Sequence, residues 1–319
     1  MANTVLDFER SFVELDELIL ETEKRITEWN PQIKMELRDL RRKRVKVYQE
    51  VYAKLTPWQR TQLARHPDRP YSLDYMNLMC ESFVEIHGDR RFADDHATVT
   101  CLARLEGKSV VIIGQQKGRG TKENIYRNFG MPNPEGYRKA LRAMLLAQKF
   151  GYPVVTLIDT PGAYPGIGAE ERGQAEAIAR NLYEMSRLKT PIISLVIGEG
   201  GSGGALGIGV ADRILMLENS IYSVISPEAC AAILWKNRDK ASDVAESLKM
   251  TGENLLKLNI IDEIIKEPLG GAHRDYTRAA NIIRRALRRH LRELMAVPLD
   301  ELLAKRFEKY RSIGVYREA

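Results

Sequence analysis

Cysteine is scarce in this chain, and its three cysteines, Cys80, Cys101 and Cys230, lie far apart. Because an odd number of widely spaced thiols does not make a disulfide framework, we expect a reducing compartment. There is no Cys-x-x-Cys pair, and the five histidines show no metal-ligand spacing. The sequence therefore predicts no metal site on this chain.

Long hydrophobic runs are missing as well. No apolar stretch approaches the roughly 20 residues that span a bilayer. The N-terminal segment Met1–Glu9 has neither the basic region nor the apolar region of a signal peptide, and it is too acidic for a transit peptide. These absences predict a cytoplasmic protein without a membrane segment.

The net charge of +6 is modest for 319 residues, but it is unevenly distributed. One basic cluster is Arg41–Arg44 with Lys46, and the second consists of Arg284, Arg285, Arg288, Arg289, His290 and Arg292. Neither contains the interleaved aromatic side chains that stack on nucleic-acid bases. The clusters favour a solvated or partner-facing helix surface over a nucleic-acid site, and an RNA-binding or scaffold role is kept as a third class of function.

Two common catalytic motifs are incomplete. Asp159–Gly162 resembles the Asp-x-x-Gly of GTP-binding proteins, but the chain lacks the phosphate-binding loop that those proteins need. Gly200–Gly204 contains the string Gly-x-Ser-x-Gly, yet no histidine is placed to activate the serine. If the chain is an enzyme, its chemistry depends on backbone N–H groups more than on side-chain acids and bases.

Apolar periodicity indicates an α/β protein. The first 55 residues form two amphipathic helices broken at Trp29–Pro31, which suggests a helical hairpin packed on the main body or on another chain. Short apolar runs that fit buried strands are Ser109–Gly114, Tyr152–Ile158, Pro191–Ile197, Ile214–Leu217 and Tyr222–Ile225. Helical patterns cover about Pro134–Phe150, Glu170–Leu188 and Thr277–Met295, and a charged tail closes the chain.

The most informative segment is the run from Pro191 to Gly209. Its strand is expected to end in a loop where five glycines crowd together, at positions 198, 200, 201, 203 and 204. Glycine loses the most conformational freedom on folding, so five glycines in one loop are costly. Their presence implies that the backbone itself must come close to another group. N–H groups at a strand-to-helix turn bind a phosphate or an oxyanion that develops during a reaction.

The segment also matches the dinucleotide-binding pattern through Gly198, Gly200 and Gly203, with Glu218 placed as a ribose contact. Three features weigh against it. Glu199 would repel a pyrophosphate, and only about nine residues separate Gly204 from the next strand, which is short for a crossover helix. In addition, two similar strand–loop–helix units precede the motif, whereas the motif usually opens its domain. An NAD(P)-dependent oxidoreductase is kept as the alternative function.

A second turn, Asp159–Gly166, precedes this segment in the chain. Pro161 and Pro165 are expected to hold it, with Asp159 capping backbone N–H groups.

A series of strings distributed over about residues 60–274 carries a family resemblance: Ala64–Tyr71, Gly88–Asp95, Gln116–Arg119, Arg127–Pro132, Pro134–Ala140, Asp159–Gly166, Ala169–Gln174, Gly198–Ala205 and Ser226–Glu228. In sequence and in order, these strings resemble the carboxyltransferase alpha subunits of bacterial acetyl-CoA carboxylase. Two departures are visible. Ala229 stands where the family's pattern usually has glycine, and Gln115 where it often has histidine.

The resemblance implies a crotonase-like (ClpP/crotonase) superhelix of repeated ββα units, with an N-terminal helical hairpin and a C-terminal helix. We expect an N-terminal helical arm at residues 1–60, a carboxyltransferase domain at 61–275 and a helical tail at 276–319.

The resemblance also implies an activity. The enzyme would transfer a carboxyl group from carboxybiotin to acetyl-CoA, forming malonyl-CoA for fatty-acid synthesis. The biotin would be carried on a separate biotin carboxyl carrier protein that biotin carboxylase loads. A homologous beta subunit, in an alpha2-beta2 assembly, would complete the active site and hold the acetyl-CoA enolate.

The site residues are likewise implied by the resemblance. Backbone N–H groups at Gly203 and Gly204 would form the oxyanion hole for biotin. Gly200 and Gly201, together with Gly162, Ala163 and Tyr164, would line the same pocket.

Overall fold

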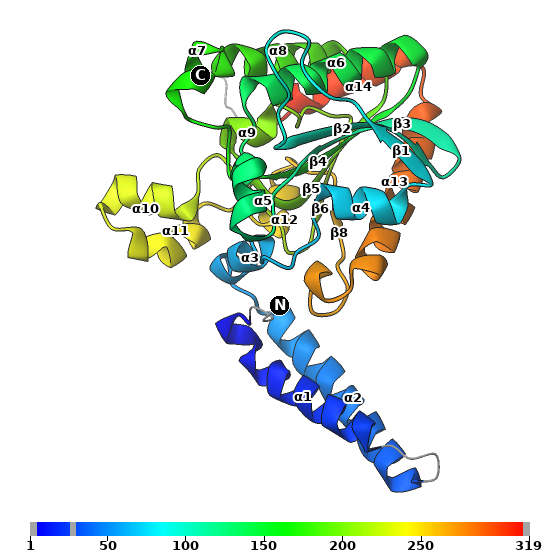
Figure 1. The fold of residues 1–319 in the computed structure, drawn as a ribbon, viewed down its shortest axis with the longest axis vertical. Coiled ribbons are helices and arrows are strands. Elements are labelled where there is room, and N and C mark those ends of the chain that lie inside the picture. The colour runs from blue at the N-terminus through cyan, green and yellow to red at the C-terminus, as the bar shows by residue number, and fades with distance from the viewer. Residues whose placement is uncertain (1–4, 26–29, 315–319) are drawn as a thin grey trace.

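The computed structural model describes residues 5–25 and 30–314, and the N-terminal part is a helical hairpin. After a short 3-10 turn at Asp7–Glu9, helix α1 (Arg10–Lys24) packs against α2 (Pro31–Tyr52). The hairpin projects from the main body, as Figure 1 shows. The predicted pair of helices is therefore confirmed.

The second helix of the hairpin begins where the sequence predicts. The side chain of Asn30 accepts hydrogen bonds from the N–H groups of Gln32 and Ile33, and Pro31 occupies the first helical position. Trp29, the other residue of the predicted break, lies outside the described residues.

The main body is built on one mixed sheet. Its strands follow the order β1-β2-β3-β4-β5-β6-β8, with β7 paired to the far end of β5. The first three strands are antiparallel, and β3 to β8 are parallel. The bounds are β1 (Ser82–Glu85), β2 (Thr98–Leu105), β3 (Lys108–Gln115), β4 (Val154–Thr160), β5 (Ile192–Gly201), β6 (Arg213–Leu217), β7 (Ile221–Ser223) and β8 (Glu263–Ile265).

Helices cover both faces of this sheet (Figure 1). The remaining helices are α3 (Pro57–Ala64), α4 (Ser72–Met79), α5 (Gly120–Tyr126), α6 (Pro134–Phe150), α7 (Ile167–Glu171), α8 (Gln174–Arg187), α9 (Ser202–Leu206), α10 (Pro227–Trp235), α11 (Ala241–Ser247), α12 (Gly252–Lys257), α13 (Tyr276–Met295) and α14 (Leu299–Arg311). None of the helices in the described part of the chain is long and apolar enough to cross a membrane.

Two hydrophobic cores lie on opposite faces of the sheet. On one face, α4 and α13 pack against strand residues such as Val155 and Leu195. On the other, α6 and α8 pack against their neighbours in sequence, such as Val154 and Val196. Because adjacent strand residues point to opposite faces and both faces are buried, the strands are continuously apolar.

Most predicted elements agree with the structure, and three need correction. The helix predicted at Glu170–Leu188 is divided, since Gly173 adopts a left-handed conformation (φ 81°) between α7 and α8. The strand predicted at Pro191–Ile197 continues through Gly201. The charged tail contains a further helix, α14, whose Arg306 is buried and binds Asp212. The predicted domain boundaries stay predictions.

Candidate active site

The glycine-rich segment lies at the carboxyl end of the central strand β5, where parallel α/β sheets commonly hold their ligands. Gly198, Gly200 and Gly201 belong to the strand, so the prediction that they lie in a loop was wrong. Their backbone pairs with β7 in the register Glu199↔Ile221 and Gly200↔Tyr222. Only Gly203 and Gly204 belong to the helical turn that follows.

Most of these glycines are required by packing inside the chain. A Cβ at Gly204 would lie 2.5 Å from the Ala163 nitrogen and 2.7 Å from the Gly162 Cα. A Cβ at Gly201 would lie 3.0 Å from the Gly162 nitrogen, and still closer to the carbonyl of Pro161. The backbone of 161–163 therefore packs directly on the glycine segment, which no larger residue would allow.

Gly203 differs from the other glycines of the segment. A Cβ added there would meet only Ile178 Cδ1, at 3.7 Å, which is an ordinary van der Waals contact. Gly203 also lines an open cavity of about 350 Å³ together with Ser202, Leu206, Tyr222 and Val224, among other residues. The chain's own packing therefore leaves room for a Cβ at Gly203, a residue that also lines the cavity.

Helix α9 presents its first N–H groups without a side-chain cap in the part of the chain that the structure describes. The first four N–H groups of a helix have no partner within it, so those at the start of α9 are available to an external acceptor. Ser202, the first residue of α9, has φ 47°, a strained value for a residue other than glycine. Strain at this position accompanies the sharp change from strand to helix.

A network of buried charged side chains contacts the glycine segment at Glu199. Lys117 Nζ lies 2.7 Å from Asp159 Oδ1 and 2.9 Å from Glu199 Oε1, and Arg65 Nε lies 2.7 Å from Glu199 Oε2. Burial alone would raise the pKa of Glu199, but the two cations outweigh it and hold the pKa at about 2. The Glu199 carboxylate is therefore ionised, and Lys117 and Arg65 balance its negative charge.

This network corrects the predicted role of Asp159. Its carboxylate does not cap the following turn but accepts the N–H of Glu199, 3.1 Å away on the neighbouring strand. The turn is held instead by the Thr160 hydroxyl, which accepts the Gly162 N–H. Asp159 thus links β4 to the glycine segment.

The turn after β4 brings two of the other predicted pocket residues close to the glycine segment. Gly162 and Ala163 lie against Gly204, as described above. Tyr164 donates its backbone N–H to Pro132, and its carbonyl accepts a bond from Gln174. Of the predicted site residues, Gly203 lines the cavity, and the others are not among its lining residues: Gly162, Ala163, Tyr164, Gly200, Gly201 and Gly204.

The dinucleotide pattern lacks its structural context. Helix α9 has only the residues Ser202–Leu206, which is too short for the crossover helix that carries a pyrophosphate. Glu218, the expected ribose contact, is bound by Lys266 and by the Glu267 N–H. Because the charge of Glu199 is balanced by Lys117 and Arg65, the expected repulsion of a pyrophosphate no longer argues against dinucleotide binding. The shortness of α9 still does.

A cluster of possible metal ligands joins the hairpin to the main body. Glu9, His66 and His273 place ligand atoms within 4.8 Å of one another. However, His66 Nδ1 accepts the Asp68 N–H, so in the neutral ring the proton lies on Nε2 and blocks a metal bond there. Glu9 already accepts hydrogen bonds from Tyr52 and Arg274. The cluster therefore fits a hydrogen-bonded contact between the hairpin and the main body better than a metal centre.

The basic clusters are partly neutralised. In the hairpin, Arg41 pairs with Glu23, and Arg44 with Asp16. On α13, Arg284 pairs with Glu106.

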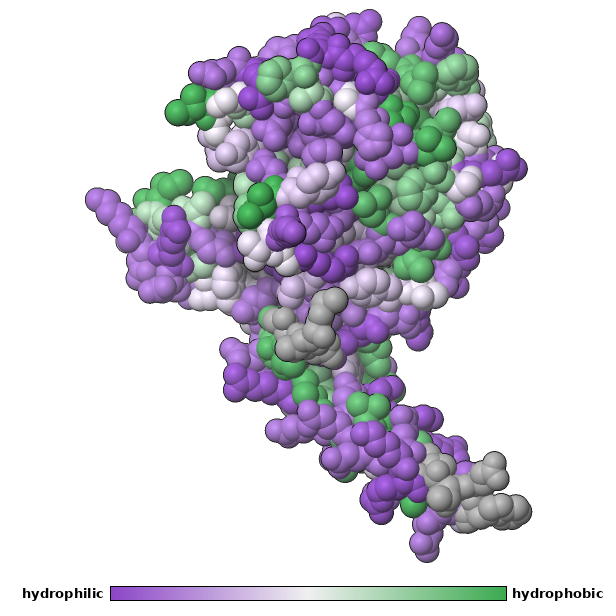
Figure 2. Space-filling model, in the orientation of Figure 1, coloured by the Kyte–Doolittle hydropathy of each residue, from purple (hydrophilic) through white to green (hydrophobic). Residues whose placement is uncertain are grey.

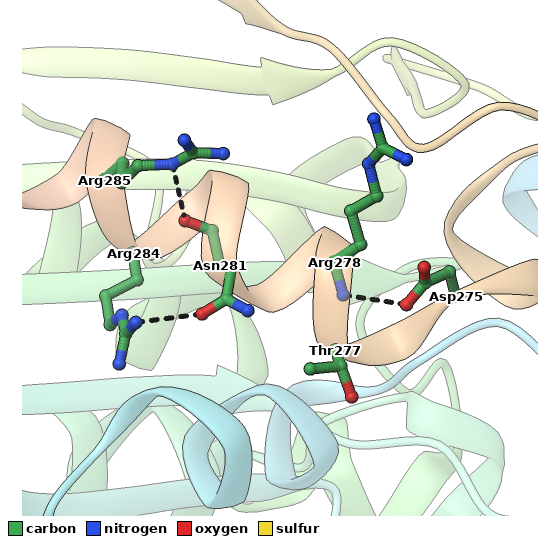
Figure 3. Close-up of a pocket in the computed structure, with 6 residues that line it drawn as sticks. All are labelled: Asp275, Thr277, Arg278, Asn281, Arg284 and Arg285. Atoms are coloured by element: carbon green, nitrogen blue, oxygen red, sulfur yellow. Dashed lines mark hydrogen bonds between the residues drawn. The ribbon is translucent and has the colours of Figure 1, made fainter.

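A shallow cavity of about 510 Å³ on α13 is lined by Asp275, Thr277, Arg278, Asn281, Arg284 and Arg285. Figure 3 shows that the hydrogen bonds among them connect near neighbours on the helix, as expected for a solvated surface.

Sequence reasoning missed two supporting residues. Gln115 and Tyr137 both donate to the Gly204 carbonyl, from strand β3 and helix α6. The structure pairs Lys117 with two buried carboxylates, Asp159 and Glu199. No local pattern reports such contacts, because their partners lie 42 to 89 residues away in the chain.

Comparison with known proteins gives one family. A family model described as "Acetyl co-enzyme A carboxylase carboxyltransferase-like" matches residues 5–314. The chain is 57% identical, over 98% of both chains, to the acetyl-coenzyme A carboxylase carboxyl transferase subunit alpha of Methylococcus capsulatus. It is 55% identical, with the same coverage, to the subunit of that name from Geobacter metallireducens.

Solved structures with the same fold are more distant in sequence. A chain of a Pseudomonas malonate decarboxylase hetero-tetramer in complex with coenzyme A superposes with a TM-score of 0.59 and 17% identity, covering 75% of this chain and 94% of that one. Transcarboxylase 12S superposes with a TM-score of 0.55 and 19% identity, covering 79% of this chain and 43% of that one. The fold is the crotonase-like fold of the carboxyltransferases, as predicted.

Proposed function

The chain belongs to the carboxyltransferase alpha subunits of acetyl-CoA carboxylase, and from this premise we propose that its biotin-binding oxyanion hole is the start of α9. The chain is one subunit of a biotin-dependent carboxyltransferase that forms malonyl-CoA from acetyl-CoA. The nicotinamide oxidoreductase alternative is not supported. The proposal assigns the backbone N–H groups of Gly203 and Gly204 as the donors.

The observation that carries this assignment is the contrast between the two glycines. Gly204 is fixed by contact with Gly162 and Ala163, whereas a Cβ at Gly203 would make only an ordinary contact with Ile178, and Gly203 lines the cavity. A position where the chain tolerates a side chain but carries none fits a requirement imposed by a ligand. We propose that the ureido ring of biotin lies beside Gly203, where a side chain would obstruct it.

When bound, carboxybiotin supplies the carboxyl group and a ureido oxygen that gains negative charge as the carboxyl leaves. We assign the N–H groups of Gly203 and Gly204 as the donors to that oxygen. Donors that are already oriented stabilise such charge without reorganising.

The charge network keeps Glu199 compatible with this role. An uncompensated carboxylate at the end of β5 would oppose a developing negative charge nearby. Lys117 and Arg65 offset the charge of Glu199 through contacts of 2.9 and 2.7 Å. We propose that this compensation preserves the electrostatic benefit of the α9 N–H groups.

The partners follow from the subunit organisation. We propose a homologous beta subunit in an alpha2-beta2 assembly, with biotin delivered on its carrier protein. Val224 and Leu258 line the cavity yet are 77% and 52% exposed, and Ile233 on α10 is 71% exposed. Figure 2 shows hydrophobic surface on the projection formed by α10 and α11. Exposed apolar side chains around a site favour coverage by a partner.

The test is reconstitution. The chain is co-expressed with candidate beta subunits, and the complex is assayed for malonyl-CoA decarboxylation in the presence of free biotin. We expect activity that needs both subunits and biotin. Activity that does not depend on biotin, or NAD(H) binding by the isolated chain in a fluorescence titration, would contradict the proposal.

A further inference from the structure

The carbonyl of Gly204 is held from outside its own helix. Helix α9 makes a single turn, in which the Gly203 carbonyl accepts the Gly207 N–H at 3.0 Å, while the Ile208 N–H goes to Ala205. The Gly204 carbonyl accepts instead from Gln115 Nε2 at 2.7 Å and from the Tyr137 hydroxyl at 3.3 Å. A buried carbonyl at a helix end needs such a donor.

The orientation of the Gln115 side chain is fixed by a second bond. Its Oε1 accepts the backbone N–H of Asp159 at 3.1 Å, so its Nε2 faces Gly204. Gln115 is only 1% exposed. One amide group therefore connects the end of β3, the end of β4 and the start of α9.

We propose that Gln115 is a positioning residue for carboxyl transfer, which sets the orientation of the α9 N–H groups through the Gly204 carbonyl. This inference rests on the proposed function of Gly203 and Gly204. Glycine backbones have wide conformational freedom, so a turn that contains two of them needs an external constraint to keep its N–H groups aligned. Catalysis by an oxyanion hole depends on that alignment.

The donors around α9 are uncharged. Burial raises the pKa of Tyr137 well above its usual value, so its hydroxyl stays protonated. Asn181 Nδ2 donates to the Gly207 carbonyl at 2.8 Å and is fully buried. Neutral donors fix the turn without adding a competing charge beside a developing oxyanion.

Three variants of Gln115 separate the donor from the acceptor function, each in complex with the beta subunit. Gln115→Leu removes both hydrogen bonds. Gln115→Glu keeps the acceptor for Asp159 but turns an acceptor toward the Gly204 carbonyl. Gln115→His restores both functions, because one imidazole nitrogen accepts while the other donates.

We expect kcat for biotin-dependent malonyl-CoA decarboxylation to fall about 10- to 100-fold in the Leu and Glu variants, as for small misplacements of catalytic groups. KM for malonyl-CoA is expected to stay within about twofold, since the substrate is held elsewhere. The His variant is expected to recover most of kcat.

The matched control is the neighbouring residue, Gln116. It is 3% exposed and also makes two amide hydrogen bonds, accepting from Leu73 and donating to the Lys117 carbonyl, neither of them to α9. Gln116→Leu is expected to lower the melting temperature about as much as Gln115→Leu does, with kcat within about twofold of wild type.

The outcomes distinguish this inference from the proposed function. Wild-type kcat in Gln115→Leu, or equal losses in Gln115→Leu and Gln116→Leu, would overturn the positioning role. So would a His variant no better than the Leu variant at equal melting temperature. If Gly203→Val is inactive while Gln115→Leu is fully active, only the inference fails, whereas an active Gly203→Val defeats the proposed function itself.

Discussion

Substitution of two adjacent glycines by alanine separates a catalytic requirement from a packing requirement. At Gly203, the new methyl group would meet only Ile178 Cδ1 at 3.7 Å. At Gly204, the same methyl group would lie 2.5 Å from the Ala163 nitrogen. The chemical change is identical, but only the second collides with the backbone of the chain.

The magnitudes follow from these contacts. Replacing a helical glycine by alanine stabilises a helix by about 0.5–1 kcal/mol, so Gly203→Ala is expected to melt at or slightly above the wild-type temperature. Gly204→Ala overpacks a buried contact and is expected to lose about 1–3 kcal/mol of unfolding free energy.

The catalytic effect is expected at Gly203 despite its intact fold. Loss of one oxyanion-hole donor costs about 2.7–4 kcal/mol of barrier, or roughly 10²–10³ in kcat. Gly203→Ala is expected to approach this loss by obstructing the ring. Gly203→Val, with its larger branched side chain, is expected to abolish carboxyl transfer and leave subunit assembly intact.

The assay is malonyl-CoA formation by the purified complex, with size-exclusion chromatography to measure assembly and calorimetry to measure stability. Near-normal malonyl-CoA formation by Gly203→Val would refute the assignment. So would a large loss of stability in Gly203→Ala, because the room for a methyl group at Gly203 would then not exist.

Three further predictions concern stability. Lys117→Met leaves two buried carboxylates without their shared cation and is expected to cost about 3–5 kcal/mol in urea unfolding. Arg306→Met is expected to cost a similar amount, because it leaves the buried Asp212 unpaired. Burial alone would raise the pKa of Glu9, but hydrogen bonding to His273 and other groups lowers it from 4.5 to about 2. Its contribution is thus present above pH 4.5 and lost as the pH falls toward 2. The melting-temperature difference between wild type and Glu9→Gln should shrink across that range.

Exposed ion pairs provide the controls. Lys305 pairs with Glu301 and is 66% exposed, and Arg311 pairs with Glu308 and is 71% exposed. Lys305→Met and Arg311→Met are expected to change stability by less than about 1 kcal/mol. Equal effects of the buried and the exposed substitutions would contradict the role assigned to burial, and a difference for Glu9→Gln that stays constant with pH would contradict its lowered pKa.

Local sequence signals predicted the elements well where one local cause dominates. Helix α6 has the predicted bounds, Pro134–Phe150, because proline begins it and the left-handed Gly151 ends it. Asn30 and Pro31 likewise start α2 where predicted. The predictions were less accurate where a segment distant in the sequence determines the local conformation. The glycine-rich end of β5, for example, is a strand because it pairs with β7.

The sequence alone determined the family and singled out a glycine-rich strand-to-helix turn as the candidate site, because composition and the surrounding strings are local facts. The tertiary structure decided which glycines the packing requires. Gly201 and Gly204 accommodate the backbone of 161–163, whereas the packing leaves room for a Cβ at Gly203, and Gln115 donates to the turn from 89 residues away. These distinctions depend on contacts between segments far apart in the chain, which only the fold brings within bonding distance.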